Sequence, residues 1–248
     1  MRQYVRVLAE VCLMAAVAAP GRAEDASAAR AIIQKAIKAE GGEARLTKYK
    51  AGICKSKVIL YGMGAGDLSC AQETAVQFPR QCRMALTSDI LKKTTVVNGD
   101  QGWVREDDQT EELTGDELAY QQEALYASWV ASLVPLKDNA FTLVALGESK
   151  VGDRAAEGVK VTRKGHADVK LYFDKKTGRL LKTERSFKSP RSGEELIEEV
   201  LFSKFQAIDG VLEPMKVTVL LNGNRSMEEE IFELRHLEKL DDKVFAKP

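Results

Sequence analysis

The sequence lacks the residues and motifs on which common enzyme chemistries depend. It contains only two histidines, His166 and His236, and neither has a carboxylate or cysteine at a spacing typical of metal ligands. No HExxH, GxSxG or P-loop motif is present, and no GxGxxG motif links a strand to a helix. We therefore expect no catalytic residue, no metal site and no cofactor, with both histidines at the surface or in turns. A hydrolase with dispersed catalytic groups is the remaining enzymatic alternative.

An excess of charge of either sign is also absent. The chain has 37 basic and 37 acidic side chains, and residues 24–248 have 34 and 36, a net charge of about −2. Such a balance offers no attraction to nucleic acid or to an anionic membrane. No linker, low-complexity tract or fixed-period repeat is found, so residues 24–248 are predicted to form one domain.

Long apolar runs are missing except near the start, where the three parts of a signal peptide occur. Arg2 and Arg6 precede an apolar stretch at residues 7–19, and Gly21-Arg22-Ala23 is a small-x-small cleavage site. The stretch is shorter than the roughly 20 residues that span a membrane. We expect residues 1–23 to be removed after Ala23 and the protein to be periplasmic or otherwise exported, with a retained anchor as the alternative.

Cysteines are few, and cleavage would leave Cys54, Cys70 and Cys82. An odd number leaves at least one thiol unpaired. If turns near residues 62–66 and 78–81 join consecutive hairpins, Cys70 lies opposite Val58 and Cys82 opposite Val76, so no two cysteines face each other directly. Three buried thiols, or one disulfide and one thiol, are both compatible with the sequence.

Hydrophobic periodicity predicts a short helix followed by many strands. The helix covers residues 27–40, with Ser27 as its N-cap and Gly41-Gly42 at its end. The connections between the strands are too short for crossover helices, so neighbouring strands are antiparallel. Eleven or twelve such strands are expected to curl into an unclosed barrel. They are residues 52–61, 67–78, 81–87, 91–98, 101–106, 140–148, 157–163, 168–174, 178–187, 194–206, 214–222 and 225–240.

One amphipathic helix interrupts the strands. Thr114 and Glu117 form a capping box, in which the Thr114 hydroxyl accepts from the Glu117 amide and the glutamate reaches back. Pro135 marks the exit from this helix. Its apolar face is formed by Leu118, Leu125, Trp129 and Leu133.

Five segments together resemble the LolA/LolB superfamily of outer-membrane lipoprotein-sorting proteins, which also includes the sensor RseB. They are residues 39–43 (AEGGE), 97–104 (VNGDQGWV), 172–178 (YFDKKTG), 202–216 and 241–245 (DDKVF). The resemblance covers nearly all of residues 24–248, but these are turn motifs and none is a chemical signature. It implies an unclosed β-barrel with helices over its concave apolar face and acyl chains bound between them. No ligand-contacting residue of the family maps onto a matching motif here.

The expected function is that of a non-catalytic carrier or binding protein for lipid or lipoprotein acyl chains. The internal helix would act as a lid, although such an apolar stripe also fits a helix that completes a solid core. An RseB-like envelope sensor or interaction module, with an envelope membrane protein as partner, is the alternative. Trp103 follows a turn and is a candidate ligand contact, although a tryptophan at such a place in a sheet is more often part of the core. The candidate cavity and lid residues are Leu118, Leu125, Trp129, Leu133, Trp103, Leu171 and Phe173.

Overall fold

The computed structural model describes residues 20–62 and 66–248, and their side chains from residue 24 onward. The predicted leader, residues 1–23, lies almost wholly outside the described residues, so the cleavage site and the domain boundary stay predictions. The helices are α1 (Pro20–Ala39), α2 (Glu43–Lys48) and α3 (Gly115–Ala131), with 3₁₀ turns η1 (Val134–Lys137) and η2 (Asp242–Phe245). Among the helices of the described ranges, none has both the length and the apolar character needed to cross a membrane.

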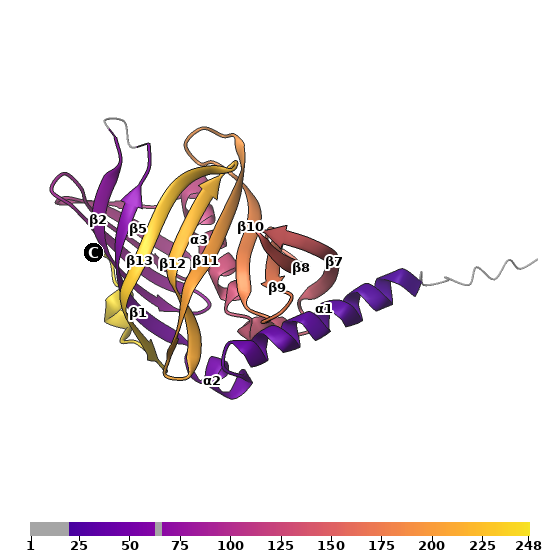
Figure 1. Cartoon of the computed structure of the whole chain (residues 1–248). Coiled ribbons are helices and arrows are strands. Elements are labelled where there is room, and N and C mark those ends of the chain that lie inside the picture. Colours follow the sequence, from indigo (N-terminus) through magenta and orange to yellow (C-terminus); the bar gives the residue numbers. More distant parts are fainter. Residues whose placement is uncertain (1–19, 63–65) are drawn as a thin grey trace, which may run out of the picture.

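The described strands form a single 13-stranded antiparallel sheet in the order β6-β5-β4-β3-β2-β1-β13-β12-β11-β10-β9-β8-β7. The sheet curves so that its two halves partly enclose α3, and β6 and β7 are its free edges (Figure 1). The predicted unclosed antiparallel barrel is thus confirmed. The strands are β1 Ala51–Leu60, β2 Leu68–Gln77, β3 Gln81–Thr87, β4 Lys92–Asn98, β5 Gln101–Glu106, β6 Gln109–Glu112, β7 Thr142–Val151, β8 Arg154–Thr162, β9 Val169–Asp174, β10 Leu180–Lys188, β11 Glu195–Ile208, β12 Val211–Leu221 and β13 Asn224–Leu237.

Three local predictions need correction. Strand β6 was missed because its sequence, QTEE, has no apolar alternation. Ser27 is not an N-cap, because α1 begins at Pro20 and Ser27 lies within it. Helix α3 starts as expected after Thr114, but without a side-chain capping bond. The Glu117 amide instead donates to the Thr114 carbonyl oxygen at 3.2 Å, where Gly115 adopts a positive φ of 52°.

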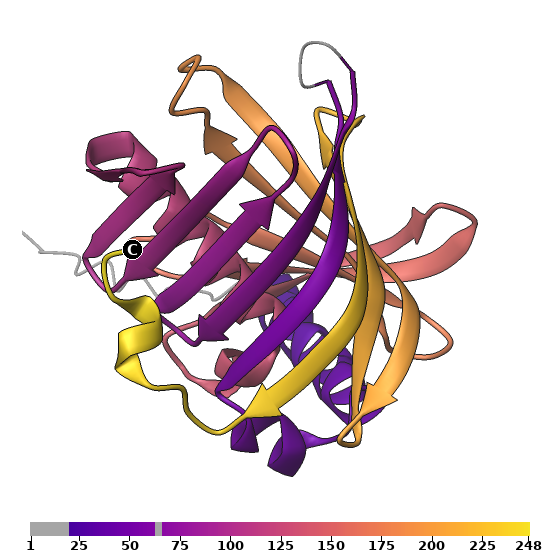
Figure 2. The same ribbon diagram turned by 90° about the vertical axis from the view of Figure 1, so that its left-hand side faces the viewer.

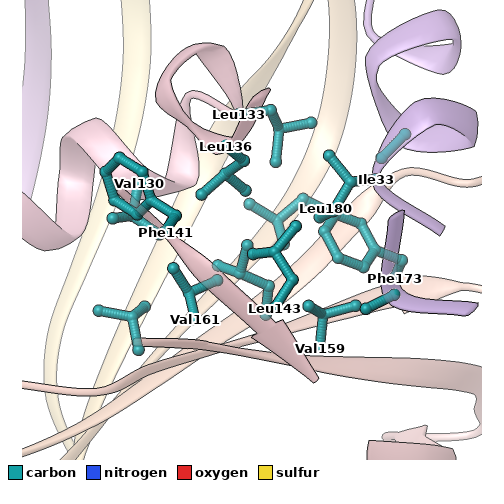
Figure 3. Close-up of a cluster of buried hydrophobic side chains, with 14 of the residues drawn as sticks. Ile33, Val130, Leu133, Leu136, Phe141, Leu143, Val159, Val161, Phe173 and Leu180 are labelled. Atoms are coloured by element: carbon teal, nitrogen blue, oxygen red, sulfur yellow. The ribbon is translucent and has the colours of Figure 1, made fainter. Parts of the chain in front are cut away.

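The larger hydrophobic cluster lies on the concave side of strands β7 to β10. Helix α1 packs against β7 and β8, and α3 and η1 cover the neighbouring strands (Figure 3). Alternate residues of each strand face this cluster, as the period-2 pattern predicts. Its members include Ile33, Ala36, Tyr126, Val130, Leu133, Leu136, Phe141, Leu143, Val159, Val161, Val169, Leu171, Phe173 and Leu180.

A smaller cluster lies on the convex side of the first strands. The C-terminal segment containing η2 runs along the outside of β3 and β4 (Figure 2), and its Phe245 packs with Val96 and Trp103. Two hydrogen bonds tie this segment down. The Asn98 side chain donates to the Phe245 carbonyl oxygen at 3.3 Å, and the Leu240 amide donates to Gln77 Oε1 at 2.7 Å.

The cysteines have the predicted register. Cys70 pairs with Val58 across β1 and β2, and Cys82 pairs with Val76 across β2 and β3. All three cysteines of the described chain are free thiols. Burial raises the pKa of Cys54 to about 12 and that of Cys82 to about 11, so both thiols remain protonated at neutral pH.

Stability is expected to depend on the larger cluster far more than on the exposed aromatic of β13. Phe173 is fully buried whereas Phe232 is 68% exposed. We expect Phe173→Ala to lower the free energy of unfolding by about 3–5 kcal/mol, because it leaves a cavity among packed side chains. Phe232→Ala should change it by less than about 0.5 kcal/mol. Chemical denaturation followed by circular dichroism measures both, and equal effects would contradict this assignment of the core.

Candidate functional site

A cavity of about 580 Å³ lies between the concave face of the sheet and the C-terminal half of α3. This volume is within the range of about 300–1,000 Å³ typical of small-molecule sites. Most of the wall is apolar, and it comes from strands that are distant in the sequence but adjacent in the curved sheet. The apolar lining residues include Leu46, Ile53, Val76, Phe78, Trp129, Ala131, Val134, Leu180, Phe202, Phe205, Val211, Leu212, Pro214 and Leu234.

The register of three neighbouring strands builds one wall. Gly52 of β1 pairs with Val76 on one side and His236 on the other, while Cys54 pairs with Thr74 and Leu234. Residues two apart in a strand share a face, so these six positions point to the same side of the sheet. Because Gly52 has no side chain, it adds no bulk between Val76 and His236.

The opposite wall is the last turn of α3. Trp129 lines the cavity, and its indole packs edge-to-face against Phe141 with ring centroids 5.8 Å apart. Ser128 and Ser132 also line this wall, but their hydroxyls donate to helix carbonyl oxygens, of Ala124 at 3.0 Å and of Trp129 at 2.6 Å. With the hydroxyl protons engaged in this way, the helix presents a surface less polar than its sequence suggests.

The seven predicted site residues do not gather at one place. Trp129 lines the cavity, whereas Leu133, Leu171 and Phe173 are buried in the larger cluster behind the helix. Leu125 and Leu118 are on α3, the first buried and the second half-buried near Gly102. Trp103 belongs to the cluster on the convex side, away from the cavity.

One end of the cavity carries a group of polar residues that sequence reasoning missed. Glu40 follows α1, and its carbonyl oxygen accepts from the Leu212 amide at 3.0 Å, which places it beside Glu213. His236 Nε2 lies 2.8 Å from Glu213 Oε1, and the Tyr49 ring stacks on the imidazole at 5.1 Å. We call Glu40, Glu213 and His236 the polar end of the cavity.

Two pKa shifts describe the charge of the polar end. Burial raises the pKa of the Glu40 carboxyl to about 8, and the nearby Glu213 carboxylate adds to the rise, while a hydrogen bond from the Leu180 backbone opposes it. The Glu213 carboxylate raises the pKa of His236 above its usual value through their hydrogen bond. At neutral pH, Glu40 is therefore mostly protonated, and the imidazolium form of His236 is favoured beside Glu213.

Glycine at position 41 allows this arrangement. Gly41 has a φ of 125°, and a side chain there would collide with the carbonyl oxygen of Gly210 in the turn between β11 and β12. The end of α1 therefore lies directly on that turn. This contact brings Glu40 to the cavity.

A second buried polar group lies farther along the same face of the sheet. Glu229 Oε1 accepts hydrogen bonds from Ser56 Oγ at 2.6 Å and from Gln72 Nε2 at 2.8 Å. Burial raises the pKa of Glu229. None of these three residues is part of the cavity wall. The apolar lining therefore stops near Cys54 and Thr74.

The polar end has no recognisable sequence motif. Glu40 reads as part of a helix stop, and its partners lie more than 170 residues away in the chain. His236, predicted to be at the surface or in a turn, has a side chain only 10% exposed. This prediction was wrong because a strand of alternating polarity does not reveal which face the fold covers. Within residues 20–62 and 66–248, no three histidine, cysteine, aspartate or glutamate side chains are grouped to hold a metal ion.

Comparison with known proteins identifies the fold. No protein-family model matches the sequence, and no curated protein matches it. A LolA superfamily protein from Nitrosomonas europaea has a similar structure, with a TM-score of 0.56 and 15% identity over 88% of this chain and 97% of that chain.

Two further solved structures show the same likeness. A DUF1329 family protein from Desulfovibrio piger gives a TM-score of 0.59 and 13% identity, over 88% of this chain and 96% of that chain. A domain from Vibrio parahaemolyticus assigned to outer membrane lipoprotein sorting gives 0.56 and 14%, over 90% and 97%. The chain thus has a LolA-like fold, which confirms the resemblance seen in the sequence at the level of fold.

The raised pKa of the half-buried Glu40 should make stability depend on pH. Because the folded pKa is raised to about 8 from an unfolded value near 4.5, the folded state binds more protons between these values. The contribution of Glu40 to the free energy of unfolding is fully present below about pH 4.5, and it is lost as the pH rises through about 8. We expect Glu40→Gln to flatten this decline in Tm measured from pH 5 to pH 9. The exposed Glu111→Gln is the control, and a decline that persists in Glu40→Gln would assign it to another group.

Proposed function

We propose that this protein is an exported, non-catalytic carrier or binding protein that holds a lipid or lipoprotein acyl chain in the cavity between the curved sheet and α3. The observation that carries the proposal is the apolar cavity of about 580 Å³, with Trp129 on one wall and Val76 and Leu234 on the other. Export is supported by the signal-peptide pattern of residues 1–23.

Binding energy of the required size is available without specific polar contacts. Each buried methylene contributes about 0.8 kcal/mol, so ten methylenes contribute about 8 kcal/mol before the cost of association. The cost of association, about 4 kcal/mol or more, is subtracted from this sum before it is converted to a dissociation constant. A site of this kind selects by cavity volume and by the few polar groups along its wall.

In this proposal the candidate residues have different roles. Trp129 contacts the chain directly, whereas Leu125, Leu133, Leu171 and Phe173 hold α3 and the strands behind it in place. Leu118 supports the N-terminal part of the helix. Trp103, on the convex side, has no role in binding.

The fold comparison supports the same class of function. One similar structure belongs to the LolA superfamily and another is a domain assigned to outer membrane lipoprotein sorting. The RseB-like alternative stays a prediction. This alternative predicts that an envelope membrane protein copurifies with the chain. The same protein should no longer copurify when Trp129 is replaced by a polar residue. The hydrolase alternative requires turnover above blank in a screen of ester, peptide and glycoside substrates.

The two tryptophans of the chain allow a direct test of binding. Trp129 lines the cavity and Trp103 lies on the other side of the sheet. Titration with a non-fluorescent twelve-carbon lipid, 1-lauroylglycerol, should change the intrinsic emission because a chain displaces water from the indole of Trp129. Trp103→Phe should retain this change, whereas Trp129→Phe should abolish it.

Native mass spectrometry of protein purified from its own cell envelope is the complementary measurement. We expect a copurifying lipid or lipoprotein. Protein that is free of lipid and also shows no emission change in the Trp103→Phe variant would contradict the proposed function.

Filling the cavity should abolish binding without unfolding the sheet. Cys54 faces the cavity, and Lys57 is exposed on the opposite face of the same strand. We expect Cys54→Trp to weaken binding of a fluorescent fatty-acid probe at least about tenfold, since the indole occupies the ligand volume. Lys57→Trp is the matched control and should bind normally. Circular dichroism checks the fold of both variants, and unchanged binding by folded Cys54→Trp would contradict the site.

A further inference from the structure

A second cavity, of about 310 Å³, lies between strands β3 to β5 and the C-terminal segment. Its lining side chains carry five positive charges and one negative charge, and the carboxylate of Pro248 adds a second negative charge. Over residues 24–248, basic and acidic side chains are almost equal in number, 34 and 36, so this excess is local. We call the site the basic cavity. Its charged side chains are Arg83, Lys92, Arg105, Lys243, Lys247 and Asp107.

The strand register brings three of these cations together on the convex side of the sheet. Thr94 of β4 pairs with Arg105 of β5, and Val96 pairs with Arg83 of β3. Lys92, Thr94 and Val96 alternate along β4 and therefore share one face. Val96 belongs to the hydrophobic cluster on the convex side. The basic cavity thus lies on the opposite face of the sheet from the apolar cavity.

The C-terminal segment supplies the other two cations. Phe245 is fully buried in the convex cluster, and Lys243 and Lys247 are two residues before and after it. Thr110 Oγ1 of β6 donates to the Pro248 carbonyl oxygen at 3.0 Å. The segment is therefore held at both Phe245 and Pro248, which keeps the two lysines beside the sheet. The basic cavity exists only when this segment is folded against β3 to β5.

The cations of the basic cavity are weakly paired with carboxylates. Arg83 lies 3.9 Å from Glu73, and Arg105 lies 3.5 Å from Asp108. None of the three lysines forms an ion pair with another residue that the structure describes. Arg105 Nε donates to the Asp107 carbonyl oxygen at 3.0 Å, which orients a guanidinium group that has four further N–H donors. Gathered like charges repel one another, and a bound anion would remove this repulsion.

We propose that the basic cavity binds a phosphate group, carried either by a soluble phosphate ester or diphosphate or by a lipid head. A phosphate monoester has a charge of about −1.5 to −2 at neutral pH and three strong acceptor oxygens. Guanidinium and ammonium groups are the side chains that recognise such oxygens. A single carboxylate would leave most of the cations unneutralised. Because the site lies on the other face of the sheet, this inference is independent of the proposed acyl-chain binding.

Isothermal titration calorimetry of the full chain at pH 7 tests the inference with inorganic pyrophosphate and with sulfate. We expect pyrophosphate to bind at least about tenfold more tightly, since it presents more charge and more acceptor oxygens to the same cations. Raising NaCl from about 0.1 M to about 1 M shortens the screening length from about 10 Å to about 3 Å, and binding should weaken at least about tenfold.

A double substitution assigns the binding to the basic cavity. Lys243 and Lys247 are exposed, so Lys243→Gln/Lys247→Gln should leave the fold intact by circular dichroism and weaken pyrophosphate binding at least about tenfold. Lys176→Gln/Lys188→Gln is the matched control. It makes the same change in net charge at two exposed positions outside the cavity, in the turn before β10 and at the end of β10. This control should bind pyrophosphate like the unaltered protein.

Vesicles of phosphatidylcholine with and without phosphatidic acid distinguish the two sources of phosphate. Cosedimentation that requires phosphatidic acid and is lost in Lys243→Gln/Lys247→Gln identifies a lipid head. Binding of pyrophosphate by protein that does not sediment with either vesicle identifies a soluble phosphate.

Three results would overturn the inference. They are equal affinity for pyrophosphate and sulfate, equal affinity of the double variant and its control for pyrophosphate, and absence of binding to both pyrophosphate and phosphatidic acid vesicles. None of them bears on the acyl-chain cavity, whose binding is followed separately through Trp129.

Discussion

The structure depends on covering the concave face of an open, strongly curved antiparallel sheet. A sheet of 13 strands that does not close has one face turned inward, and its apolar side chains must be kept from water. Helix α1, helix α3 and η1 do this completely over β7 to β10, where the interior is solid. Over β1, β2 and β11 to β13 the cover is incomplete, and a cavity remains. The extent of helix cover therefore divides the concave face into a solid core over β7 to β10 and a candidate binding site over the other strands.

Much of the fold was predictable because it follows from local patterns. Alternating strands joined by short turns dictate an antiparallel sheet, and the pairing of Cys70 with Val58 followed from turn positions alone. The polar strand β6 carried no such pattern. The site was less predictable, because the sequence shows that Trp129 and Leu133 share an apolar stripe but not that a cavity adjoins only the first. Trp103 and Phe173 are similarly apolar, and only the three-dimensional packing places them in different clusters.

The polar end illustrates the limit of sequence reasoning more clearly. Glu40, Glu213 and His236 come from the end of a helix and from two late strands, so no spacing rule connects them. Their environment sets their chemistry: the pKa of Glu40 is raised to about 8 by burial and by a neighbouring carboxylate, not by any residue adjacent in the chain. Acidic residues inside an otherwise apolar wall are costly unless they are paired, as Glu213 is with His236.

The contact between Gly41 and the β11–β12 turn has a wider consequence. A Cβ at position 41 would lie 2.4 Å from the Gly210 carbonyl oxygen, so that turn leaves no room for a side chain. A larger residue there requires the end of α1 or the β11–β12 turn to move, next to the 3.0 Å hydrogen bond between the Leu212 amide and the Glu40 carbonyl oxygen. A residue outside the cavity wall thus takes part in setting the environment of Glu40.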